Sequence, residues 1–197
     1  MVMNVAMLAD EREMLLNFLR PGTKYIEFGT GDSTLLALQR RVAQCVGIET
    51  DAQWLTKIRE HALIREAEAA GQVRLHHVDI GEVGPWGVPL NRSKIEKWPS
   101  YFLDAWSLMK GTPDVVLVDG RFRTACACTA MMAYPRYTTI LINDFFDENP
   151  VRANYRRLLE VAEIVESQSN LVSLRRKEGV DQASLMKIVS DVWVDYW

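Results

Sequence analysis

The chain has 197 residues, 48% of them apolar and 25% charged, which is enough for one globular domain with a sizeable core. Its formal net charge is -3, from 23 Lys and Arg against 26 Asp and Glu. Dedicated nucleic-acid or anionic-membrane binders normally carry a basic excess, so this balance argues against both classes of partner. A chain of this length leaves little room for a separate recognition domain, and we therefore expect a small-molecule substrate.

The first residues and the cysteines favour a cytoplasmic protein. Residues 1–10 contain no Lys or Arg and lack the long apolar run of a signal peptide. Apolar runs elsewhere are far shorter than the ~18–20 residues of a membrane span. Three cysteines, an odd number, argue against a disulfide framework and favour a reducing compartment.

Strand-like and helical patterns alternate along the chain. An opening helix lies within residues 1–22 and stops at Pro21-Gly22. The predicted strands are 24–29, 45–49, 73–79, 114–119 and 138–143, and helices are predicted around 35–42, 55–62, 100–109, 123–133 and 151–159. Residues 164–167 and 171–175 are predicted to pair as antiparallel strands before a final helix around 185–193.

Five strand–helix units with β-branched strands predict an α/β fold, a Rossmann-like doubly wound sheet with helices on both faces. We expect a single domain over 1–197, with the opening helix in 1–22, ligand-binding units in 23–146, and the rest of the sheet with the C-terminal helix in 147–197. Such sheets bind ligands beyond the carboxyl ends of their strands. Residues 81–97, rich in Gly and Pro, form the longest irregular stretch, and long loops of this kind are often functional.

The turn after the first strand carries Gly29 and Gly31, which permit a tight turn and a close approach of a ligand to the backbone. Thr34 stands where the dinucleotide-binding fingerprint has its third glycine, and no Lys follows as it would in a phosphate-binding P-loop. The turn therefore favours a nucleoside ligand without a pyrophosphate.

Acidic residues recur at the ends of all five strands: Glu27, Glu49, Asp79, Asp119 and Asp144. Glu49 follows Glu27 at close to the spacing at which an acid accepts hydrogen bonds from ribose hydroxyls. Taken alone, Glu49 fits a solvated acid equally well. Helix capping explains one or two such acids, and a polar ligand site explains the whole set better.

Residues 25–34, Tyr-Ile-Glu-Phe-Gly-Thr-Gly-Asp-Ser-Thr, resemble the first motif of class I S-adenosylmethionine-dependent methyltransferases, and residues 46–51 resemble the segment that follows it. Residues 114–123, with Asp-Gly-Arg-Phe-Arg at 119–123, resemble an uncharacterised bacterial group of methyltransferase-like proteins. The resemblance implies a seven-stranded sheet, mostly parallel with one antiparallel strand, in which 23–146 form the cofactor-binding part.

The resemblance also implies roles for individual residues. The methionine end of the cofactor would be lined by Glu27, Gly29, Thr30, Gly31 and Ser33. The ribose hydroxyls would bind Glu49, the adenine amino group would face Asp79, and Ile80 or Trp86 would cover the adenine ring. Asp119 would lie beside the sulfonium and the acceptor.

Methyl transfer from a sulfonium is an in-line displacement, so the protein mainly positions the nucleophile and sometimes removes its proton. Asp119 and Asp144 are placed to do this. Arg121 and Arg123 either bind a carboxylate or phosphate of the substrate or pair with nearby acids such as Asp144, and both interpretations stay open.

Oxygen ligands for Mg²⁺ are available at Asp119, Asn143 and Asp144. The order Asn-Asp at 143–144 is the reverse of that in metal-dependent O-methyltransferases, so we predict no metal.

The sequence thus predicts an enzyme that transfers a methyl group from S-adenosylmethionine to a small-molecule acceptor. The alternative is a catalytically silent nucleoside-binding module on the same fold, and Thr34 disfavours a third hypothesis, an NAD-dependent oxidoreductase. The aromatic residues in 193–197 pack either on the sheet or on a second subunit of a homo-oligomer.

Overall fold

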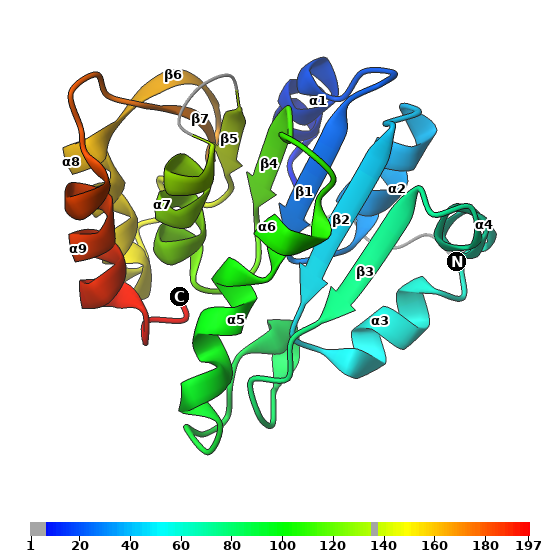
Figure 1. Cartoon of the computed structure of the whole chain (residues 1–197), viewed down its shortest axis with the longest axis horizontal. Helices are drawn as coiled ribbons and strands as arrows, with labels where there is room; N and C mark the ends of the chain where they lie inside the picture. Colours follow the sequence, from blue (N-terminus) through cyan, green and yellow to red (C-terminus); the bar gives the residue numbers. More distant parts are fainter. Residues whose placement is uncertain (1–6, 135–137) are drawn as a thin grey trace.

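The computed structural model describes residues 7–134 and 138–197 (Figure 1). Seven strands form one sheet in the order β3-β2-β1-β4-β5-β7-β6. All pairs are parallel except those of β7, which runs antiparallel to both β5 and β6. The predicted sheet, mostly parallel with one reversed strand, is confirmed. The strands are β1 (Lys24–Phe28), β2 (Gln44–Glu49), β3 (Val73–His77), β4 (Val115–Val118), β5 (Thr139–Ile142), β6 (Ala162–Gln168) and β7 (Leu171–Arg176).

Helices surround this sheet, and three of the predicted ones differ from the structure. The region after β2 forms two helices because the Asp51 and His61 side chains each cap a new N-terminus. The helix predicted around 100–109 is divided into α5 and α6, and the one around 151–159 is mostly the 3-10 helix η3, which buries only Tyr155. The helices are α1 (Ala9–Phe18), α2 (Asp32–Gln39), α3 (Ala52–Ile58), α4 (Ala62–Ala69), α5 (Trp98–Leu103), α6 (Ala105–Leu108), α7 (Arg123–Ala133), α8 (Leu158–Val161) and α9 (Gln182–Val192), with 3-10 turns η1 (Pro85–Gly87), η2 (Ile95–Lys97) and η3 (Pro150–Arg157).

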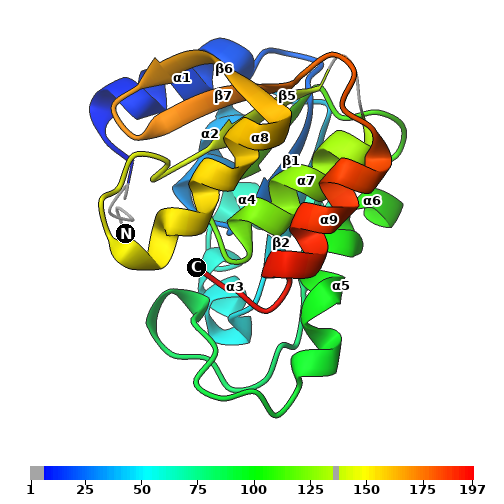
Figure 2. The same cartoon turned by 90° about the vertical axis from the view of Figure 1, so that its left-hand side faces the viewer.

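Side chains alternate across the sheet and form one core on each face. Ile26 and Phe28 point into the core beneath α5, α7 and α9, whereas Tyr25 points into the core beneath α1, α2 and α4. Figure 1 shows α7 and α9 in front of the sheet and α1 and α2 behind it, and Figure 2 shows α1 and α9 on opposite faces. Coverage on both faces explains why runs such as 115–118 are apolar throughout.

The strand order reverses between β1 and β4. From β1 the chain moves outward to β2 and β3, and it then returns to place β4 on the other side of β1. The strand pairing continues one residue further, because the backbone N–H of Gly29 donates to the carbonyl of Ile48 and that of Asp119 to the carbonyl of Phe28. The polar residues that follow these strands therefore meet at one edge of the sheet, where such folds bind ligands.

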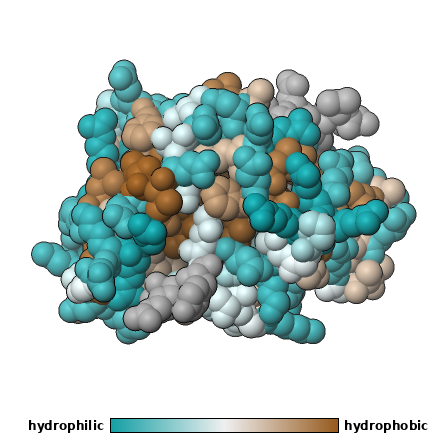
Figure 3. All heavy atoms as spheres, turned by 90° about the horizontal axis from the view of Figure 1, so that it is seen from above, coloured by the Kyte–Doolittle hydropathy of each residue, from teal (hydrophilic) through white to brown (hydrophobic). Residues whose placement is uncertain are grey.

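The outer strand β6 is exposed along nearly its whole length, with Ile164 and Val165 among the exposed apolar side chains. Figure 3, seen from the amino ends of the parallel strands, shows hydrophobic patches among mostly hydrophilic residues. Trp193, Val194 and Tyr196 pack against the core of their own chain, so the first of the two interpretations of this segment is correct. A homo-oligomer stays a prediction. None of the described helices is long and apolar enough to cross a membrane.

Replacing Gly29 tests the close approach of β1 and β4. Gly29 has a φ of +87°, and a Cβ there would lie 2.8 Å from the backbone of Gly120. Gly71 has a similar φ, +71°, with open space around it. We expect Gly71→Ala to lower the free energy of unfolding by about 1–2 kcal/mol through backbone strain alone. Gly29→Ala should lose about 2–5 kcal/mol because overpacking adds to the strain. Equal losses in urea unfolding would contradict this packing.

Candidate active site

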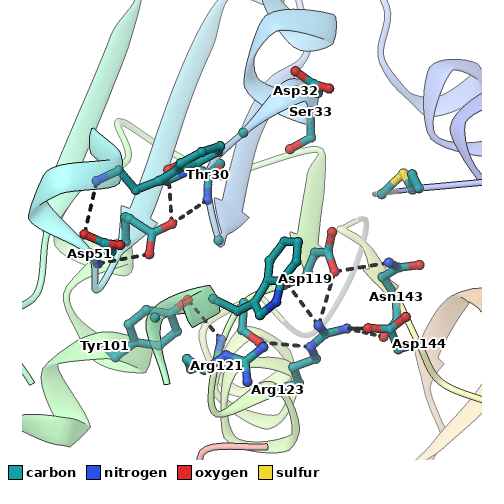
Figure 4. Close-up of a pocket in the computed structure, with 18 of the residues that line it drawn as sticks. Thr30, Asp32, Ser33, Asp51, Tyr101, Asp119, Arg121, Arg123, Asn143 and Asp144 are labelled. Carbon is teal, nitrogen blue, oxygen red and sulfur yellow. Dashed lines mark hydrogen bonds and ion pairs between the residues drawn. The ribbon is translucent and has the colours of Figure 1, made fainter. Parts of the chain in front are cut away.

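A cavity of about 720 Å³ opens at the carboxyl ends of β1, β2, β4 and β5. Figure 4 shows its labelled residues in two groups. Thr30, Asp32, Ser33 and Asp51 come from the β1 and β2 side, and Asp119, Arg121, Arg123, Asn143 and Asp144 come from the β4 and β5 side, with Tyr101 of α5 beside the second group. The cavity therefore lies at the reversal of strand order.

Most of the residues predicted from the sequence line this cavity. They are Gly29, Thr30, Gly31, Ser33, Glu49, Trp86, Asp119, Arg121, Arg123 and Asp144. Glu27, Asp79 and Ile80 do not line it. Residues brought together from positions 29 to 144 of the chain share one edge of the sheet because the strands before them are parallel and in register.

The placement of Asp79 and Ile80 differs from the prediction because β3 ends at His77, two residues early. Asp79 lies in the following loop, where its carboxylate pairs with Lys94 and accepts from the backbone of Gly81. Ile80 is fully buried in the core, and its carbonyl accepts from the Trp98 indole at 3.0 Å. These two residues therefore do not face the space in which an adenine ring was expected.

Glu27 lies fully buried directly beneath the glycine turn. Its carboxylate accepts from the hydroxyls of Ser33 at 2.6 Å, Tyr25 at 3.1 Å and Thr34. Burial raises the pKa of Glu27 to about 7, although these hydroxyls favour the charged form. Glu27 holds the turn in place from below, and Ser33 connects it to the cavity.

Glu49 joins the β1 turn to the end of β2. Its Oε2 accepts from the backbone N–H of Thr30 at 3.0 Å, and its Oε1 accepts from that of Thr50 at 2.7 Å. The hydroxyl of Thr50 donates in turn to the carbonyl of Gly87 at 3.1 Å, which fastens the 81–97 loop to the same place. The neighbouring Trp86 is 81% exposed at the rim of the cavity and has a φ of 62°.

On the other side of the cavity, the Arg123 guanidinium joins the exits of β4 and β5. Arg123 is 3% exposed, and its Nη2 and Nη1 lie 3.3 Å from Asp119 and 3.0 Å from Asp144. It also donates to the carbonyls of Gly120 and Asn143, at 3.0 and 2.5 Å. The structure therefore shows the predicted pairing of Arg123 with Asp144.

Asp119 lies at the edge of the cavity with part of its carboxylate buried. Burial raises the pKa of Asp119, and the Arg123 charge opposes that rise. The Asn143 side chain donates to Oδ1 of Asp119 at 3.1 Å, and the Asp119 side chain is 25% exposed. Among the described residues, no group of three or more His, Cys, Asp or Glu is arranged to hold a metal ion.

Four residues of the site have no signal in the sequence. Trp54 donates to the Thr30 carbonyl at 2.7 Å, and the Tyr101 hydroxyl accepts from the Arg121 backbone at 3.2 Å. Arg152 pairs with Asp144 at 2.9 Å, and the Trp197 ring lies 5.1 Å from the Arg121 guanidinium carbon. These contacts join elements distant in the sequence, so local spacing does not indicate them.

Two solved structures show the same fold. A methyltransferase-like protein from Silicibacter pomeroyi matches with a TM-score of 0.75 and 25% identity, covering 98% of each chain. The C-terminal domain of precorrin-6Y C5,15-methyltransferase from Rhodobacter capsulatus matches with a TM-score of 0.54 and 14% identity, covering 88% of this chain and 92% of the other. No protein-family model and no curated protein sequence matches. The chain therefore has a methyltransferase-type fold.

Removing Arg123 should destabilise the protein strongly. Arg123→Met leaves Asp119 and Asp144 near one another without the guanidinium between them. We expect a loss of about 3–5 kcal/mol in the free energy of unfolding, measured in urea. Arg175→Met is the control, because the Arg175–Glu163 pair is 69% exposed on the arginine side and should cost less than about 1 kcal/mol. A loss no larger than that of the control would disprove the role of Arg123.

The raised pKa of Glu27 gives a pH dependence of stability. Between the unfolded value of about 4.5 and the folded value of about 7, the native state holds more protons than the unfolded state. Stability from this group therefore falls as the pH rises through that window. Relative to Glu27→Gln, the wild-type protein should lose roughly 2–3 kcal/mol between pH 5 and pH 8 in urea unfolding. Parallel curves for the two proteins would show that Glu27 ionises normally.

Proposed function

We propose that the protein transfers a methyl group from S-adenosylmethionine to a small-molecule acceptor. The observation that carries the proposal is the cavity at the reversal of strand order, with a glycine turn and Glu49 on one side and Asp119 on the other. The fold shared with the Silicibacter pomeroyi methyltransferase-like protein supports it. No metal is part of the proposal.

The residues on the β1 and β2 side fit the cofactor. A Cβ built at Gly31 would meet only the Trp54 ring, at 3.9 Å, so the turn leaves open space for a ligand. Gly29, Thr30, Gly31 and Ser33 would hold the methionine end, and Glu49 would accept from the ribose hydroxyls. Trp86 would cover the adenine ring from the rim. When bound, S-adenosylmethionine supplies a methyl group already activated by its sulfonium.

The residues on the β4 side would act on the acceptor. Asp119 keeps an exposed edge in the cavity, and burial makes its carboxylate a stronger base. Asp119 would therefore orient an acceptor hydroxyl or amine and take its proton. Asp144 is paired with both Arg123 and Arg152, so we assign it to holding Arg123 rather than to proton transfer.

We also propose a cytoplasmic location and an acceptor that is neither a nucleic acid nor a membrane lipid. Cys45, Cys126 and Cys128 are free and buried, which suits a reducing compartment. The net charge of -3 disfavours binding to polyanions.

Calorimetric titration with S-adenosylhomocysteine tests the proposal. Glu49→Ala removes the acceptor for the ribose, and we expect about 10- to 100-fold weaker binding than in the wild-type protein. Glu178→Ala, an exposed acid outside the cavity, should bind as the wild-type protein does. Glu49 also accepts a hydrogen bond from the Thr30 backbone, so its replacement can weaken binding by disturbing the fold. Glu49→Gln keeps the shape of the side chain, and the melting temperature of each variant shows whether it is still folded. No binding at millimolar ligand would refute the cofactor, and binding without turnover on a broad acceptor panel would refute the transfer.

A further inference from the structure

Arg121 is a buried arginine to which the described part of the chain offers an aromatic ring, Trp197, but no carboxylate partner. It follows β4 in the loop before α7, and it is 6% exposed. Its backbone N–H donates to the Tyr101 hydroxyl, and the next residue, Phe122, has a left-handed backbone with a φ of 53°. The hydrogen bond from its backbone to Tyr101 therefore fixes where the Arg121 side chain begins.

Within residues 7–134 and 138–197, neither Nε nor Nη1 of Arg121 has a hydrogen-bond partner, and no carboxylate lies within ion-pair distance. The remaining residues, 1–6 and 135–137, contain no Asp or Glu. Burial, with the charge of Arg123, lowers the pKa of Arg121, so its surroundings disfavour the charged form. Buried charges in proteins are normally paired, and an unpaired one indicates a ligand.

The neighbouring arginines show the contrast. Arg123 pairs with Asp119 and Asp144, and Arg152 pairs with Asp144 and Asp147. This cluster has two cations and three anions, and its members Arg123, Asp119 and Asp144 line the cavity together with Arg121 (Figure 4). Without a positive group of its own, this side of the cavity would repel an anionic acceptor.

We propose that Arg121 binds an oxyanion group, a carboxylate or phosphate, on the methyl acceptor. The inference rests on the proposed function and names the class of its substrate. A guanidinium presents planar paired donors that match two oxygens of such a group. Asp119 lies two residues earlier on the same strand exit, so an acceptor held by Arg121 would have its hydroxyl or amine within the same part of the cavity.

The carboxylate of the cofactor's methionine end is a second oxyanion that Arg121 could bind. The methionine end is proposed to lie at the turn after β1, whereas Arg121 comes from β4 beside Asp119. The Trp197 ring lies 5.1 Å from the Arg121 guanidinium and lines the same part of the cavity. The acceptor is therefore the source to which we assign the oxyanion.

The first test is the stability of the ligand-free protein. Arg121→Met removes an unpaired buried charge, so its melting temperature should rise above that of the wild-type protein. Arg123→Met, which removes a paired charge, should melt lower. A lower melting temperature for Arg121→Met would show that Arg121 supports the fold and would overturn the proposal.

The second test is calorimetry with inorganic phosphate and with benzoate, each with and without saturating S-adenosylhomocysteine. We expect the wild-type protein to bind at least one of these anions, and Arg121→Met to bind it about 30-fold more weakly or worse. Arg121→Lys keeps the charge without the planar donors and should be intermediate. Arg40→Gln, an exposed arginine at the far end of α2, should leave binding unchanged. Absence of anion binding in the wild-type protein, or equal binding by Arg121→Met, would overturn the proposal.

S-adenosylhomocysteine and 5′-methylthioadenosine, which lacks the amino-acid carboxylate, distinguish the two sources. If Arg121→Met weakens binding of the former and spares the latter, Arg121 binds the cofactor carboxylate and the proposal is overturned. Equal affinity of the variant and the wild-type protein for both supports it. Arg121-dependent anion binding in a protein that fails to bind S-adenosylhomocysteine would refute the proposed methyl transfer while supporting the oxyanion site.

Discussion

The buried guanidinium of Arg123 is the interaction on which the β4 and β5 side of the cavity depends. It lies between Asp119 and Asp144 and also binds the carbonyls of Gly120 and Asn143, so one side chain fixes two loops that follow different strands. Such a pair offsets its desolvation only when its remaining donors are also bonded, as they are here. With Arg123 fixed, Asp119 keeps a single orientation at the edge of the cavity.

Arg121 and Arg123 are two residues apart and both buried, yet their surroundings differ. Phe122, in the left-handed conformation, separates a side chain that meets two carboxylates from one that meets none. Arg123 is bonded to its partners, whereas we propose that Arg121 costs stability until it binds an anion. Residues that bind ligands often carry such a cost, because preorganised charge must exist before the ligand does.

Much of the fold was predictable because its signals are local. Apolar β-branched runs gave the five parallel strands, and the acids that follow them placed Glu49 and Asp119 at one edge. The end of β3 was predicted two residues late, and Asp79, which follows it, does not line the cavity. Trp54 was not predictable because its contact with Thr30 depends on how α3 packs. For Arg123 the sequence left two interpretations open, and only the packed structure shows the pairing with Asp144.

The 81–97 loop shows how a chain of this length builds the remaining wall of its cavity. The carbonyl of Gly87 accepts from the Thr50 hydroxyl. The Glu49 carboxylate accepts from the backbone N–H groups of both Thr50 and Thr30, the latter in the turn after β1. A side chain at Gly87 would clash with Thr50, and its positive φ also favours glycine. The loop is thus anchored at Gly87, and the neighbouring Trp86 stays exposed at the rim. This loop therefore links an aromatic side chain at the rim directly to the residues proposed to hold the ribose.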